Sequence, residues 1–165
     1  YLLIPEGGAG TPGAKGCSEI MELTDTKSYS HIICAAGTGT MFAGLLNAAT
    51  PNQTVIGIPV LKGITDFWQQ VEYMIEKKER KAGSQFFYDY HFGGYAKYKP
   101  ELIAFMNNFY SQTGVPSDFV YTGKLLFAAN DLLKQNYFSK GSRLLIIHSG
   151  GLQGNAGLPK GTLIF

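Results

Sequence analysis

Apolar and polar residues follow one another along the chain in blocks that predict strands and helices in alternation. The clearest block is the apolar run 32–36, which has the length of a buried strand and is followed by a Gly/Thr segment and a helical apolar pattern to about Ala49. The stretch from His31 to Leu45 therefore predicts a strand, a tight loop and a helix N-terminus.

The same pattern predicts further strands over 1–4, 55–61 and 143–148 and helices over about 14–23, 64–81, 100–112 and 124–137. The helix predicted over 64–81 would place five apolar residues on one face: Phe67, Trp68, Val71, Met74 and Ile75. Repetition of strand then helix is typical of a parallel sheet covered on both faces. We therefore expect a three-layer α/β fold with a mainly parallel sheet.

The loop at positions 37–40 (Gly-Thr-Gly-Thr) is a candidate anion site. Free N–H groups and the helix dipole at a helix start attract a phosphate, and glycines let the backbone approach it closely. Two threonine hydroxyls could add hydrogen bonds. A strand that only needs a glycine before the next helix would have the same pattern, so both interpretations stay open for this loop alone.

Composition excludes several classes of protein. The 165 residues are 45% hydrophobic and 16% charged, which indicates one globular domain. The net charge is +2 and the 14 basic residues are scattered, which argues against a nucleic-acid surface. The one charge run, at 77–81, would be a solvated last turn of its helix.

Cysteine usage and hydropathy bear on location. Cys17 and Cys34 lack metal-ligand spacing, so we expect two reduced, core-like thiols, a cytoplasmic protein and no metal site. The sequence has neither a signal-peptide pattern nor an apolar stretch of about 18 residues, so no membrane partner is expected. The strand-like start at Tyr1, without a methionine, predicts that the chain is part of a longer one.

Ligands of parallel α/β sheets bind at the carboxyl ends of the strands. Five polar, glycine-rich segments are predicted there: 6–8, 37–40, 93–95, 121–124 and 148–151. A tyrosine such as Tyr95 or Tyr121 could instead be a half-buried packing ring, and His148 a hydrogen-bonded core histidine. Five loops at one edge nevertheless indicate a binding site.

These loops carry a resemblance to a known family. The segments Ile4-Pro5-Glu6-Gly7-Gly8, Gly37-Thr38-Gly39-Thr40, Gly94-Tyr95, Val120-Tyr121-Thr122-Gly123-Lys124 and His148-Ser149-Gly150-Gly151 occur in this order. In order and spacing the chain resembles the 1-aminocyclopropane-1-carboxylate deaminase and D-cysteine desulfhydrase family. These are pyridoxal-phosphate enzymes of the tryptophan synthase β-subunit superfamily (fold type II).

The resemblance implies pyridoxal 5'-phosphate as cofactor and a role for each matching residue. Gly37, Thr38, Gly39, Thr40 and Met41 would hold the phosphate, although Met41 replaces a hydroxyl or small residue of the family pattern. Tyr95 and Tyr121 would be the catalytic tyrosines, Thr122 would meet the pyridine nitrogen, and Ser149 would line the pocket. A homodimer and a small amino-acid substrate are also implied.

The family's lysine that binds the cofactor covalently has no counterpart here. Lys62 and Lys124 do not match its position. Residues 1–165 would then be the C-terminal part of the large cofactor-binding domain. The N-terminal segment, with the lysine, and the small domain would lie outside this chain.

Thr122 bears on the reaction. In this family the enzymes that open the cyclopropane ring carry glutamate after the tyrosine, so Thr122 resembles the desulfhydrase branch and predicts β-elimination to a keto acid and ammonia. Deaminase activity on 1-aminocyclopropane-1-carboxylate is the alternative.

Two further hypotheses stay open. The chain could be a non-catalytic phosphate- or nucleotide-binding α/β module, although the central loop lacks the Gly-x-Gly-x-x-Gly pattern. It could also be a remnant that kept the fold and lost the cofactor, which the missing lysine favours.

Overall fold

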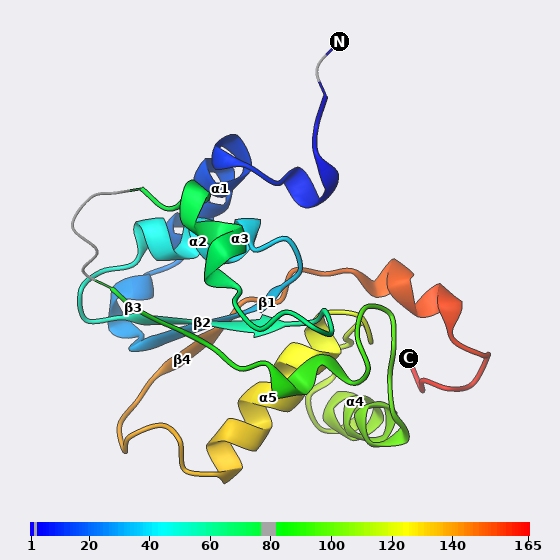
Figure 1. The fold of residues 1–165 in the computed structure, drawn as a ribbon. Coiled ribbons are helices and arrows are strands. Elements are labelled where there is room, and N and C mark those ends of the chain that lie inside the picture. Colours follow the sequence, from blue (N-terminus) through cyan, green and yellow to red (C-terminus); the bar gives the residue numbers. More distant parts are fainter. Residues whose placement is uncertain (2, 77–81) are drawn as a thin grey trace.

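The computed structural model describes residues 1, 3–76 and 82–165 (Figure 1). Its centre is a parallel sheet of β1 (His31–Ala36), β2 (Thr54–Pro59), β3 (Gly83–Phe86) and β4 (Leu144–Ile146), in the order β3-β2-β1-β4. Ile32 of β1 lies opposite Val55 of β2 and Leu145 of β4. The predicted parallel sheet is confirmed.

Helices cover both faces of the sheet (Figure 1). One face carries α1 (Thr11–Ser18), α2 (Thr40–Ala48) and the short α3 (Trp68–Val71). The other face carries α5 (Thr122–Lys134), with α4 (Pro100–Thr113) packed beside it. Six 3-10 turns complete the described elements: η1 (Glu6–Gly8), η2 (Glu19–Glu22), η3 (Thr26–Ser28), η4 (Glu72–Met74), η5 (Asp89–His91) and η6 (Leu152–Gly157).

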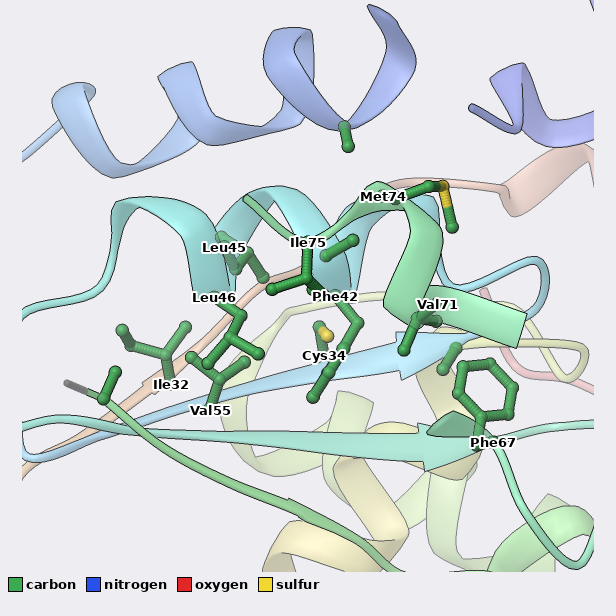
Figure 2. Close-up of a cluster of buried hydrophobic side chains, with 14 of the residues drawn as sticks. Ile32, Cys34, Phe42, Leu45, Leu46, Val55, Phe67, Val71, Met74 and Ile75 are labelled. Carbon is green, nitrogen blue, oxygen red and sulfur yellow. The ribbon is translucent and has the colours of Figure 1, made fainter. Parts of the chain in front are cut away.

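The apolar run of β1 is continuous because both faces of this strand are buried. Ile32, Cys34 and Ala36 face the cluster under α2, whereas Ile33 and Ala35 face the cluster against α5. Successive strand residues point to opposite faces, so a strand in the middle of three layers needs apolar residues at every position. Figure 2 shows the first cluster, in which Phe42 and Leu45 of α2 lie over β1 and β2.

The helix predicted over 64–81 is wrong in length. The structure has only α3 and η4 in this segment, and the chain is extended at Ile75. Asn47 of α2 explains the early end: its amide donates to the Met74 carbonyl and accepts from the Glu76 N–H, both at 3.0 Å. These bonds hold the backbone in an extended form, while the apolar residues of the predicted face still pack into the core (Figure 2).

The strand predicted over 1–4 is also wrong. Tyr1, Leu3 and Ile4 belong to no strand, and Leu3 and Ile4 are 88% and 73% exposed. A hydrophobic pattern shows which residues can form a strand but not which strand they pair with. The charge run 77–81 lies outside the described residues.

Other predicted elements are confirmed within a few residues, except that the helix predicted over 14–23 is divided into α1 and η2. Strand β3 was not predicted, because Gly83-Ser84-Gln85-Phe86 is short and has little apolar character. Among the described residues no helix has the length and apolar character that crossing a membrane requires.

Candidate active site

A cavity of about 510 Å³ opens at the carboxyl end of β1. Its walls come from segments far apart in the sequence: Glu6, Gly7, Cys17, Ala35, Gly37, Thr38, Gly39, Thr40, Met41, Tyr121, Ser149, Gly150, Gly151 and Gln153. Its size lies in the usual range for small-molecule sites. Its position at the strand ends is the expected one for a parallel sheet.

The loop before α2 forms one wall of the cavity. Gly39 is the N-cap residue of α2 with a left-handed backbone (φ 83°), and no side chain caps the helix. The first N–H groups of α2, those of Thr40 and Met41 among them, therefore have no acceptor within the helix. The hydroxyls of Thr38 and Thr40 lie 2.9 Å apart beside them. This wall offers donors and the positive end of a helix dipole to an anion.

Tyr121 lines the cavity beside this loop. Its ring approaches the loop closely, with Cε1 only 3.2 Å from the position that a Cβ would take on Gly37. The ring of Tyr95 packs edge-on against it, with centroids 6.0 Å apart. Burial, followed by the effects of Tyr95, Asp118 and Glu6, raises the pKa of Tyr121 to about 12. The phenol of Tyr121 therefore keeps its proton at neutral pH.

A buried carboxylate builds the turn that presents Tyr121. Asp118 is 0% exposed, and its Oδ1 accepts from the N–H groups of Val120 at 2.8 Å and Tyr121 at 2.7 Å. Its Oδ2 accepts from the N–H of Thr122 at 2.9 Å and from the Thr122 hydroxyl at 2.5 Å. One side chain thus satisfies three N–H groups at the start of α5, where a negative charge is also favourable.

The C-terminal segment supports the same turn. Asn155 of η6 accepts from the Phe119 N–H at 3.1 Å and donates to the Ser117 carbonyl at 3.0 Å. His148 is exposed rather than in the core, but it is hydrogen-bonded: Nε2 lies 2.9 Å from the Pro116 carbonyl, and Nδ1 accepts from the Gly150 N–H. These contacts join the loop after β4 to the loop before α5.

Most of the predicted site residues come together. Gly37, Thr38, Gly39, Thr40, Met41, Tyr121 and Ser149 all line the cavity. Tyr95 does not line it, but its ring packs against that of Tyr121. Thr122 does not line it. The Thr122 side chain is 0% exposed, and its hydroxyl donates to Asp118 Oδ2 and accepts from the Asp118 N–H at 2.8 Å.

Sequence reasoning missed Cys17, Gln153 and the support given by Asp118. Cys17 lies near the end of α1 and lines the cavity, whereas the sequence predicts a core-like thiol. The Asp118 side chain accepts from the N–H two positions on, at Val120, and an Asp in such an Asx-turn is the local signal that could have indicated the turn. Lys62 and Lys124 are not among the residues that line the cavity, and the described residues contain no group of His, Cys, Asp and Glu suited to a metal ion.

The two thiols differ in a way that can be measured. Burial raises the pKa of Cys34 to about 12, and it raises the pKa of the half-buried Cys17 as well. We expect iodoacetamide at pH 8 to modify Cys17 slowly and Cys34 only after unfolding. Because Cys17 lines the cavity, a ligand bound there should slow its modification at least about threefold, and pyridoxal phosphate, which the sequence resemblance implies, is the ligand to test on the complete protein. Peptide mapping by mass spectrometry measures this, and equal rates with and without the ligand would place the ligand elsewhere.

Comparisons with known proteins agree with the sequence resemblance. The chain is 31% identical, over 92% of its length, to a Pyrococcus abyssi protein provisionally named 1-aminocyclopropane-1-carboxylate deaminase. It is 27% identical, over 90% of its length, to the D-cysteine desulfhydrase of Klebsiella pneumoniae. No family model matches the chain.

A solved structure shares the fold. The crystal structure of an ACC deaminase homologue superposes on 92% of this chain with a TM-score of 0.74 at 24% sequence identity, and this chain covers 50% of it. The chain also spans about half the length of the curated relatives it matches, 50% in both cases above. Over that half of their length, the chain is therefore a homologue of the 1-aminocyclopropane-1-carboxylate deaminase and D-cysteine desulfhydrase family.

Proposed function

We propose that this chain is part of a pyridoxal-phosphate-dependent lyase or deaminase that acts on a small amino acid. The observation that carries the proposal is the wall at the start of α2, where free N–H groups and two threonine hydroxyls face a cavity shared with Tyr121 and Ser149. The names of the relatives support the enzyme class.

The described residues fit this cofactor at its phosphate. The backbone of Gly37, Gly39 and Met41 and the hydroxyls of Thr38 and Thr40 would hold the phosphate, since all of them line the cavity. The Met41 side chain offers no hydroxyl, so its contribution would be the backbone N–H. Ser149 is exposed on the same cavity and is free to contact the ring.

Pyridoxal phosphate, when bound, accepts the electrons of a bond that breaks at or near the α-carbon of an amino acid. The protein controls where protons go. Because the pKa of Tyr121 is raised to about 12, its Oη keeps its proton at neutral pH and would donate a hydrogen bond to the departing sulfur. Tyr95, with its ring against Tyr121, would orient that phenol. In this proposal Tyr121 is therefore a hydrogen-bond donor to the leaving group.

The preferred reaction is β-elimination of the type catalysed by a D-cysteine desulfhydrase. D-cysteine and water would give a keto acid, ammonia and hydrogen sulfide. A relative named D-cysteine desulfhydrase supports this choice, whereas Thr122 no longer does, because its hydroxyl binds Asp118 away from the cavity. Deamination of 1-aminocyclopropane-1-carboxylate, with water, to a keto acid and ammonia is the second candidate, because relatives carry that name as well.

Several features of the complete protein belong to the same proposal. The lysine that binds the cofactor covalently would lie in the half of the relatives that this chain does not span. Assembly as a homodimer and a cytoplasmic location complete the proposal, and the free thiols Cys17 and Cys34 are consistent with a reducing compartment.

The test uses the complete protein, purified and supplied with pyridoxal phosphate. D-cysteine, β-chloro-D-alanine and 1-aminocyclopropane-1-carboxylate are assayed side by side for keto acid and ammonia. We expect turnover of D-cysteine and its chlorinated analogue. Turnover of the cyclopropane substrate alone would reverse the choice of branch. No turnover and no cofactor binding would favour the phosphate-binding module or the remnant without cofactor.

Substitution of Thr122 separates its two possible roles. Thr122→Val removes the hydroxyl that donates to Asp118 Oδ2, so we expect a loss of about 1 kcal/mol or more in the free energy of unfolding. Because both hydrogen bonds of this hydroxyl go to Asp118, the affinity for pyridoxal phosphate should change less than about twofold. Thr122→Ser keeps the hydroxyl and is the control. If Thr122 contacted the cofactor ring, as the sequence predicts, Thr122→Val would lose that hydrogen bond. Cofactor binding would then weaken about fivefold.

A further inference from the structure

Lys124 is a buried cation outside the cavity. Its residue is 0% exposed, although lysine usually keeps its amine at the surface. Nζ donates to the Gly94 carbonyl at 2.7 Å, across 30 positions of the chain. A buried amine is costly unless it is hydrogen-bonded, so this contact has to be strong to keep it there.

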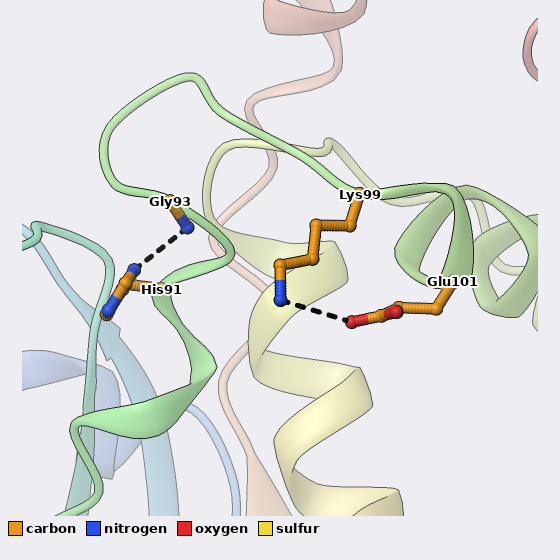
Figure 3. A network of polar contacts seen from close by, with 4 residues as sticks. All are labelled: His91, Gly93, Lys99 and Glu101. Carbon is orange, nitrogen blue, oxygen red and sulfur yellow. Dashed lines mark hydrogen bonds and ion pairs between the residues drawn. The ribbon is translucent and has the colours of Figure 1, made fainter.

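The acceptor lies in a loop whose backbone has an unusual shape. Gly93 and Gly94 have φ of 103° and 120°, and a Cβ on Gly94 would lie 3.2 Å from Lys62 Cβ. His91 Nδ1 accepts from the Gly93 N–H at 2.9 Å (Figure 3), and the Gly94 N–H donates to the His91 carbonyl. These bonds are local, whereas the bond from Lys124 attaches the loop to α5.

The same bond links the segments of the two tyrosines. Tyr95 directly follows Gly94, and Tyr121 precedes Lys124 by three positions. Tyr95 is 55% exposed, and its ring meets the ring of Tyr121 at a centroid distance of 6.0 Å. Because much of the Tyr95 side chain is exposed, the position of its backbone bears directly on this ring contact. The Gly94 carbonyl is the backbone group immediately before Tyr95.

We infer that Lys124 is a positioning residue that holds Tyr95 against Tyr121 by binding the Gly94 carbonyl. The expected effect on catalysis rests on the proposed function, in which the two tyrosines are catalytic. The expected placement of Tyr95 by Lys124 does not depend on that function.

The titration behaviour of these groups provides a readout. Burial lowers the pKa of Lys124 to about 8, and Asp118 opposes this shift. The amine donates in both protonation states, so the link to Gly94 is kept on either side of that pKa. The raised pKa of Tyr121 has burial as its largest cause and Tyr95 as the next, with Asp118 and Glu6 adding to it. The pKa of Tyr121 therefore reports whether Tyr95 is in place.

The experiment measures this pKa in the complete protein with ¹³C-labelled tyrosine by NMR, using Tyr121→Phe to assign the signal. Lys124→Met keeps an apolar stem and removes the donor. We expect the pKa of Tyr121 to fall by about 0.5 unit or more as Tyr95 moves away. With substrate, kcat should fall at least about tenfold and KM change less than about twofold, because misplaced catalytic groups affect the chemical step.

Lys97→Met is the matched control, because Lys97 is an exposed lysine of the same loop. It should leave the pKa of Tyr121 and kcat unchanged. In a Tyr95→Phe background, Lys124→Met should no longer shift the pKa of Tyr121, since the phenol through which it acts is gone. If Lys124→Met does not fold, Lys124→Gln, whose amide is too short to reach Gly94, takes its place.

The inference is overturned if Lys124→Met behaves like Lys97→Met, or if its effect is equally large in the Tyr95→Phe background. An inactive parent protein would contradict the proposed function alone, because the pKa comparison among the variants needs no turnover.

Discussion

Replacing Gly39 by valine in the complete protein is expected to weaken pyridoxal-phosphate binding at least about a hundredfold. Gly39 has φ of 83°, and a Cβ there would lie 2.2 Å from Val71 Cγ1 and 2.8 Å from Phe67 Cε1. A left-handed conformation costs a β-branched residue about 1–3 kcal/mol, and the contacts with these two buried side chains add to this cost. The loop must move, and with it the N–H groups of Thr40 and Met41. Equilibrium dialysis with the cofactor measures the effect.

Gly63→Val is the matched control for this substitution. Gly63 has a similar φ of 87°, but no atom lies within 4 Å of the position of its Cβ, and it does not line the cavity. Gly63→Val should carry the same cost of a left-handed backbone as Gly39→Val. It should leave the affinity for pyridoxal phosphate within about twofold of that of the parent protein. Cofactor affinity of Gly39→Val equal to that of Gly63→Val would remove the loop before α2 from the site.

The second large effect is expected from Asp118→Ala. The carboxylate of Asp118 accepts from three N–H groups and one hydroxyl while fully buried, so its removal leaves several polar groups without a partner. Each such group costs about 1–3 kcal/mol, partly recovered by relaxation, and we expect a loss of at least about 3 kcal/mol in the free energy of unfolding. Denaturant unfolding followed by circular dichroism measures it.

Two other variants define the origin of this loss. Asp118→Asn keeps one carbonyl oxygen and should lose less than Asp118→Ala. Asp25→Ala removes an exposed carboxylate that, among the described residues, accepts one hydrogen bond, from the Lys27 N–H at 3.3 Å, and it should cost about 0.5 kcal/mol or less. If Asp118→Ala were no more costly than Asp25→Ala, the turn before α5 would not depend on the carboxylate.

The central strand and its helix could be predicted from sequence because their apolar pattern results directly from burial. Every residue from Ile32 to Ala36 is buried between two layers, and the short length of the run and the glycines that follow it favour a strand over a buried helix. The segment after Ile64 could not be predicted in this way. Its helical spacing is real, but the side chain of Asn47, in another element, holds the backbone extended at its end.

In the candidate site, too, some features could be predicted from local sequence and others could not. The loop before α2, Tyr121 and Ser149 could be predicted because glycines and polar residues at strand ends are local signals. The position of Thr122 could not, because its hydroxyl has two possible partners and only the folded turn shows that it binds Asp118. The bond from Lys124 to Gly94 spans 30 positions, and no local pattern indicates it.

The most direct test of the account is a crystal structure of the complete protein with pyridoxal phosphate. We expect the phosphate at the start of α2, with its oxygens about 2.7–3.2 Å from the N–H nitrogens of Thr40 and Met41. Tyr121 and Ser149 should lie on the ring side of the same cavity. A phosphate bound at any other loop, with the N–H groups of Thr40 and Met41 facing solvent, would contradict the account.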